Sequence, residues 1–136
     1  MTSLEKTICN LIIRAQMWSD AAKGYDSALE DSRFCSKYLS KYYCYNKKDH
    51  CIQQALCLLK RNKRCNISYY ISEDKKLRSA IVYFEIHVET KKFQISFHSF
   101  NNGLINAIGT GKPMRWKGIV GSSRKAAEDL QVILMV

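Results

Sequence analysis

The spacing of apolar residues changes along the chain, and this change is the strongest limit on its fold. Up to about residue 62, apolar side chains recur every three to four positions, as in amphipathic helices. Between residues 66 and 100 they alternate with polar side chains, as in strands with one buried face. Helical spacing returns at about residue 122. We therefore expect an α+β fold, in which helices pack on one face of a small antiparallel sheet of about three strands and a C-terminal helix follows.

Three helices are expected before the sheet. Thr2–Glu5 fits a capping box at the start of the first helix, and Gly24 suits its C-cap. A second helix is expected over residues 26–44. The polar stretch that follows ends at Asp49, which can cap a third helix over residues 49–62.

The strongest strand signals predict a hairpin. Strands are expected over residues 66–72, 80–88 and 93–100, and the last two are joined by a turn centred on Thr90 and Lys91. In this register the opposed pairs are Phe84 with Phe97, Ile86 with Ile95, Val88 with Phe93, and Tyr83 with His98. The apolar pairs should be buried beneath the helices. The other face should meet water, and it carries Tyr83, Glu85, His87, Gln94, Ser96 and His98.

Positive charge is concentrated in the second part of the chain. The 22 Lys and Arg residues against 12 Asp and Glu give a net charge of +10. Residues 1–46 hold six basic and five acidic side chains, so nearly all the excess belongs to residues 47–136. We therefore expect a helical extension over 1–46, packed on a basic α-β-β-β-α domain over 47–136. A field of this sign favours a polyanion as the partner: nucleic acid, an anionic membrane surface or an acidic protein.

Composition also bears on location and on thiol chemistry. No apolar run approaches the length of a membrane span, and no basic segment followed by an apolar one precedes residue 8. We expect a cytoplasmic protein, of the cell that makes it or of a host cell. The six cysteines, none in a C-x-x-C pair, are interpreted as buried or half-buried reduced thiols. A disulfide set is the alternative.

The last expected helix begins with a basic pair after two serines. Ser122 or Ser123 can cap it, and Arg124 and Lys125 fall in its first turn, where free N–H groups attract anions. Residues 101–121 precede it, an irregular stretch rich in glycine. This stretch carries a second set of candidate phosphate and base contacts: Lys112, Arg115, Trp116 and Lys117.

The order of elements over residues 48–136 resembles the double-stranded-RNA-binding domain. The residues that carry the resemblance are Leu56–Arg61, Tyr69–Asp74 and Ser123–Ala126. The resemblance implies that Ser123, Arg124 and Lys125 bind phosphates across the major groove. It also implies that Gln53 and Gln54 meet the minor groove. The chain departs from the family in lacking the Gly-Pro-x-His of the first strand loop, and in the long insertion before the last helix.

A catalytic interpretation is also open. His87 and His98 are expected on one sheet face near Glu85, where a thiol such as Cys44 or Cys51 would complete a Cys–His nucleophile pair. The same histidines with Glu85 or a cysteine are the candidate ligands of a metal. Exposed strand residues that make only cross-strand contacts are the simpler interpretation.

Three hypotheses for function follow. The leading one is a small basic binding protein, without catalysis or a cofactor, that contacts nucleic acid through phosphate, with RNA preferred over DNA. The second is a protein-binding inhibitor or adaptor, of the kind found in phages and mobile elements, acting on a nucleic-acid-processing partner. The third is a Cys–His hydrolase or a metal site on the sheet. No membrane partner is expected, and the sequence leaves the oligomeric state open.

Overall fold

The chain folds as an α+β structure, as expected from the sequence. The computed structural model describes residues 1–26, 34–62, 64–74, 76, 79–99 and 123–135, and of residues 25, 26 and 34–40 it describes the backbone alone. In chain order the elements are α1 (Ser3–Asp26), α2 (Phe34–Arg61), β1 (Ile67–Asp74), β2 (Ser79–Val88), β3 (Lys91–Ser99) and α4 (Ser123–Leu134). The strands form one antiparallel sheet in the order β1-β2-β3.

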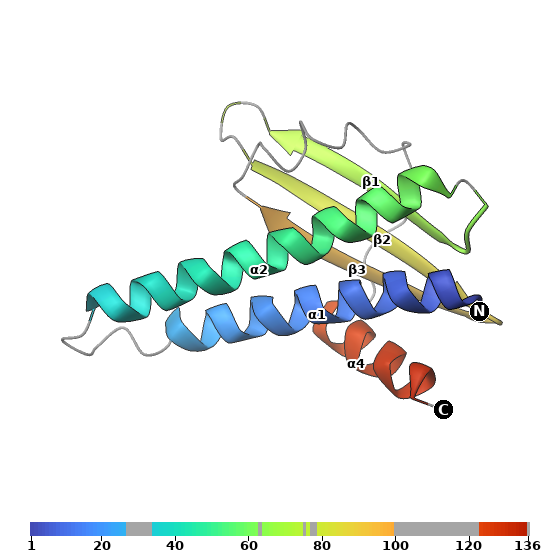
Figure 1. Ribbon diagram of the computed structural model, residues 1–136, viewed down its shortest axis with the longest axis horizontal. Coiled ribbons are helices and arrows are strands. Elements are labelled where there is room, and N and C mark those ends of the chain that lie inside the picture. Colours follow the sequence, from blue (N-terminus) through green and yellow to red (C-terminus); the bar gives the residue numbers. More distant parts are fainter. Residues whose placement is uncertain (27–33, 63, 75, 77–78, 100–122, 136) are drawn as a thin grey trace.

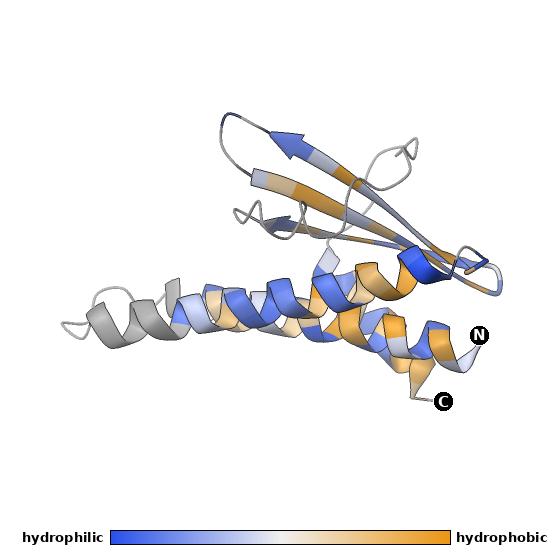
Figure 2. Ribbon diagram, turned by 45° about the horizontal axis from the view of Figure 1, so that its top comes forward, coloured by the Kyte–Doolittle hydropathy of each residue, from blue (hydrophilic) through white to orange (hydrophobic). Residues whose placement is uncertain are grey.

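The helices form a layer against one face of the sheet. Helices α1 and α2 run antiparallel side by side beneath the strands, and α4 packs against both α1 and β3 (Figure 1). Apolar residues are concentrated where the helix layer and the sheet converge, near the N-terminus of α1 (Figure 2). Among the described helices, none combines the length and the apolar character needed to cross a bilayer.

Helix α2 is longer than expected, because two predicted helices are one. It passes without interruption through residues 46–49, so the expected helix start at Asp49 is wrong. This stretch contains no Gly or Pro to break the helix, and Lys48 is buried on its inner face. The boundary drawn from charge, between residues 46 and 47, therefore lies inside α2. The expected C-cap at Gly24 is also wrong, since α1 continues to Asp26 and Gly24 keeps a helical backbone.

The hairpin register differs from the expected one by two residues. Val88 pairs with Lys91, Ile86 with Phe93, Phe84 with Ile95, Val82 with Phe97, and Tyr83 with Ser96, so the turn consists of Glu89 and Thr90. The expected pairing of Tyr83 with His98 is wrong. Glu89 takes a positive φ of 56°, as the first central residue of a tight hairpin turn, and this shortens the loop. A shift of two residues leaves every side chain on its expected face.

The buried face of the hairpin is therefore as predicted. Phe84, Ile86 and Ile95 are fully buried and Phe97 nearly so. They share one core cluster with residues of α1, α2 and α4: Ile8 and Ile12, Ile52 and Leu56, and Ala127 and Leu130. On the opposite face, His87 and His98 are exposed and Tyr83, Glu85, Gln94 and Ser96 are half-buried. Tyr83 there stacks on Tyr70 of β1, with ring centroids 5.9 Å apart.

One buried carboxylate joins the first helix to the first strand. The predicted capping box is confirmed: Thr2 N–H donates to Glu5 Oε1 at 3.0 Å, and Glu5 N–H donates to Thr2 Oγ1 at 3.1 Å. The other carboxylate oxygen accepts the backbone N–H of Asn66 at 2.8 Å. The carbonyl of Asn66 accepts from His87 N–H, which extends the pairing of β1 with β2. The Thr2 N–H above all, and then that of Asn66, lower the pKa of Glu5 against the opposing effect of burial.

The left-handed backbone at Glu89 predicts that glycine is preferred there. Glu89→Gly should raise the free energy of unfolding by up to about 1 kcal/mol, because it removes a Cβ clash at positive φ. Thr90→Gly is the matched control. Thr90 has no positive φ, so this change should lower stability through backbone entropy. Urea denaturation measures both, and equal effects at the two positions would show that φ is not the cause.

The Glu5 junction predicts an acid-sensitive contribution to stability. Glu5→Gln should lower the free energy of unfolding by about 1.5–3 kcal/mol near neutral pH, since charge-assisted hydrogen bonds are lost. The folded pKa lies below its ordinary value, so the contribution is complete above that value and disappears as pH falls through the folded pKa. Urea denaturation from pH 7 to pH 3 should show the two proteins converging. Glu73→Gln, at an exposed position on β1, should show no such gap.

Candidate functional site

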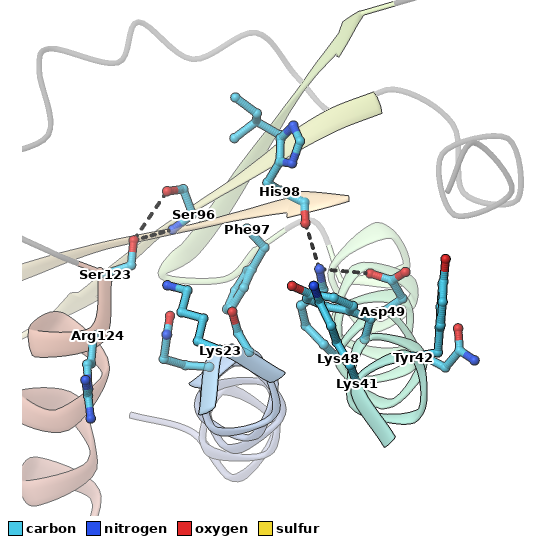
Figure 3. Close-up of a pocket in the computed structure, with 15 residues that line it drawn as sticks. Lys23, Lys41, Tyr42, Lys48, Asp49, Ser96, Phe97, His98, Ser123 and Arg124 are labelled. Carbon is cyan, nitrogen blue, oxygen red and sulfur yellow. Dashed lines mark hydrogen bonds and ion pairs between the residues drawn. The ribbon is translucent and has the colours of Figure 1, made fainter. Parts of the chain in front are cut away.

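A cavity of about 880 Å³ lies between α1, α2, the end of β3 and the start of α4 (Figure 3). Its floor consists of the buried side chains Gln16, Lys48 and Phe97. Its rim consists of the exposed residues Lys23, Tyr42, Asn46, His98 and Arg124. Among the described residues, its lining includes four basic side chains, one from α1 (Lys23), two from α2 (Lys41 and Lys48) and one from α4 (Arg124), and one carboxylate, that of Asp49. We call this hollow the basic cavity.

Lys48 is the best-fixed cation of the basic cavity. Its Nζ donates to the backbone carbonyl of His98 at 2.7 Å and lies 3.6 Å from Oδ1 of Asp49. The same ammonium lies 5.0 Å from the ring centroid of Tyr45, within the range of a cation–π contact. These contacts hold the middle of α2 against the end of β3. They also explain why Lys48 can be buried. The polar stretch 46–49 was expected to break the helix, but α2 continues through it.

Burial weakens the charge of both members of this pair. Desolvation lowers the pKa of Lys48, Asp49 opposes that shift, and the nearby charge of Lys23 adds to it. Desolvation likewise raises the pKa of Asp49, while Lys48 and a hydrogen bond from Ser99 oppose it. Within the described residues Asp49 Oδ1 is buried without a hydrogen bond, so the ion pair with Lys48 is its compensation. Titratable groups shifted in this way, in a cavity, mark a candidate functional site.

The start of α4 closes one side of the basic cavity. The hydroxyl of Ser123 accepts the backbone N–H of Ser96 at 3.0 Å, and so ties the helix start to the edge strand β3. This hydroxyl therefore contacts the sheet, whereas Ser123 was expected either to cap its own helix, with Ser122 as the alternative, or to bind phosphate. Arg124 lies beside it and makes ion pairs with Asp20 of α1 at 3.5 Å and with Glu128 at 3.6 Å.

The remaining predicted nucleic-acid contacts are scattered. Lys125 is exposed but does not line the cavity. Gln53 and Gln54 also lie outside the lining, and Gln54 hydrogen-bonds the ring of His50 at 3.1 Å. The other predicted contacts lie outside the described residues: Lys112, Arg115, Trp116 and Lys117. The alternative helix cap, Ser122, also lies outside them.

The two sheet histidines do not form a common site. They share a face, but His87 pairs with Lys92 whereas His98 pairs with Ile81, six residues further along β2. That offset is about 20 Å at the rise of a strand, too far for one metal ion or one substrate bond. Glu85 forms ion pairs with Lys92 and, at 3.8 Å, with His87. Over the described ranges, no three His, Cys, Asp or Glu side chains gather closely enough to hold a metal.

The thiols have the properties of core residues. Cys9, Cys44 and Cys51 are buried, as expected, and Cys57 and Cys65 are half-buried. All five are free, and the side chain of Cys35 lies outside the described residues. Burial above all raises the pKa of Cys44 and Cys51, and it raises that of Cys9 to about 12. A nucleophilic cysteine needs the opposite shift, so the geometry gives no support to the Cys–His pair.

Sequence reasoning missed three of the four cations of the basic cavity: Lys23, Lys41 and Lys48. Two of them lie in the nearly neutral segment 1–46, so the charge asymmetry pointed away from them. The available signal was the spacing of Lys41 and Lys48, seven residues apart on one helix. Two turns of helix place such residues on one face, but only once the helix is recognised as continuous.

Comparisons with known proteins identify no relative of this chain. No protein-family model, no curated protein and no solved structure matches it.

The buried pair at the cavity floor predicts a strongly non-additive mutant cycle. Lys48→Met should lower the free energy of unfolding by about 3 kcal/mol, because it leaves the Asp49 carboxylate buried without its cation. Adding Asp49→Asn removes that charge and should recover part of the loss. Urea denaturation of both single variants and of the double variant measures the coupling. Purely additive effects would show that the two charges do not stabilise each other.

Proposed function

We propose that this chain is a noncatalytic binding module that takes nucleic acid through its phosphates at the basic cavity. The observation that carries the proposal is the convergence of Lys23, Lys41, Lys48 and Arg124, from three separate helices, on one hollow. A preference for RNA over DNA rests on the resemblance of residues 48–136 to the double-stranded-RNA-binding domain. Lys125, Lys112, Arg115 and Lys117 belong to the proposal as further phosphate ligands, and Trp116 as a ring that stacks on a base.

Electrostatics favours an anion as the ligand. Burial above all lowers the pKa of Lys48, and the positive charge of Lys23 adds to that shift, so the two ammonium groups repel each other. Asp49 compensates Lys48, and Asp20 and Glu128 compensate Arg124. Within the described residues no ion pair joins Lys23 to a carboxylate. A phosphate beside Lys23 and Lys41 would offset part of the positive charge that lines the cavity and would gain two charge-assisted contacts.

Salt dependence tests the proposal. Fluorescence anisotropy with labelled RNA should give a linear fall of log K with log salt between about 50 and 200 mM. Lys23→Ala combined with Lys41→Ala should weaken binding and reduce the slope by about 1.5, the share of two phosphate contacts. Lys76→Ala combined with Lys91→Ala is the matched control, since it removes the same charge from exposed positions outside the cavity lining.

The outcomes separate the competing functions. Equal losses from both double variants would show that net charge acts without a defined site, and would contradict the cavity as the binding site. No measurable binding to RNA or DNA at about 50 mM salt, where nonspecific phosphate binding is strong, would reject the nucleic-acid proposal. The inhibitor or adaptor hypothesis, with an acidic protein at the same basic surface, would then be the better account of the charge.

A further inference from the structure

The shape of the basic cavity limits what can enter it. Its volume of about 880 Å³ lies in the range of pockets that enclose small ligands, roughly 300–1,000 Å³. Its floor is buried and its rim exposed, so a ligand enters from solvent and is partly enclosed. In a nucleic-acid duplex the bases are stacked inside a rod whose outer surface is phosphate and sugar. Only an unpaired nucleotide presents a base that fits inside such a hollow.

The rim carries an aromatic ring placed to receive a base. Of the described residues that line the cavity, three are aromatic: Tyr42, Tyr45 and Phe97. Phe97 is buried in the core against Phe84, with ring centroids 6.0 Å apart. The ring of Tyr45 is contacted by the ammonium groups of Lys41 at 5.8 Å and Lys48 at 5.0 Å. Among these described rings Tyr42 has the largest exposed fraction, 48%, so it offers the most surface to a ligand.

Cationic side chains and the Tyr42 ring line the same cavity. Lys41 directly precedes Tyr42 on α2, and Lys23 enters the cavity from α1 (Figure 3). In the same view Tyr42 rises beside Asp49, at the side of the cavity far from Ser123 and Arg124. A strand lying across the mouth would thus meet a base-stacking surface on α2 and phosphate-binding cations on both helices. This combination of aromatic side chains with a positive groove is the usual recognition mode for single strands.

We propose that the basic cavity holds one unpaired nucleotide of single-stranded nucleic acid, with its base stacked on Tyr42 and its flanking phosphates on Lys23 and Lys41. The inference rests on the proposed function and narrows its ligand from nucleic acid in general to single strands. It differs from what the family resemblance implies, namely binding of a duplex through the start of α4.

Neighbouring tyrosines provide the test. Tyr43 is 55% exposed, with its ring 5.8 Å from that of Trp18 and contacted by Lys47, and it does not line the cavity. Tyr42→Ala should weaken binding of a labelled 12-nucleotide single-stranded RNA by about 5- to 150-fold, the effect of one stacked base. Tyr43→Ala should change binding less than 2-fold, and Tyr42→Phe, which keeps the ring, should bind within about 3-fold of the wild type. Circular dichroism checks that all three variants fold.

The second part of the experiment measures binding to an RNA duplex of the same sequence. The wild type should bind it more weakly than the single strand at equal salt, and Tyr42→Ala should leave duplex binding unchanged. Equal or tighter duplex binding, or equal effects of Tyr42→Ala and Tyr43→Ala on the single strand, would overturn this inference. If the inference fails but single-stranded and duplex RNA both bind, and both bind less tightly after the loss of Lys23 and Lys41, the proposed function still holds. If neither form binds, the proposed function itself has failed.

Discussion

The carboxylate of Glu5 is the contact through which the two halves of the fold are joined. One of its oxygens completes the first turn of α1, and the other accepts the N–H of Asn66 at the entry to β1. Asn66 in turn pairs with His87, so the same residue starts the sheet. The sheet thereby begins directly over the first turn of α1, and the apolar faces of both layers converge at that end. The core is built at this end of the molecule, and the basic cavity lies further along the same two helices.

Local signals predicted the fold well because each acts over a few residues. The Thr2–Glu5 capping box forms as its spacing demands. Phe84 and Ile95 are buried because side chains alternate between the two faces of a strand, and a register shift of two residues does not change that face. The register itself was out of reach, since it depends on Glu89 accepting a positive φ that sequence rules reserve for glycine or asparagine. The continuity of α2 was missed for a related reason: Lys48 and Asp49 resemble a polar break until their tertiary partners on β3 are known.

The candidate site was only partly predictable, because it is assembled from distant segments. Arg124 was singled out from its position in a helix start, and it lines the basic cavity. Lys23 and Lys41 belong to a segment of balanced charge and gain their role only from the way α1 and α2 pack against β3. The net charge of a segment therefore does not predict the charge of a surface, because folding brings together side chains from different segments. A shared face also does not imply proximity. His87 and His98 lie on the same face of the sheet but near opposite ends of the hairpin.

The continuity of α2 has a consequence for how this chain can evolve. A single rigid helix carries Leu56 in the core and Tyr42 at the cavity rim, so the angular relation between the two is set by helical periodicity alone. Inserting or deleting one residue between them would rotate the cavity side chains by about 100° relative to the core. The exposed positions between residues 43 and 55 should therefore tolerate substitution better than this segment tolerates a change in length. Variation in what the cavity accepts has to come from exchanging side chains on a segment whose length is constant.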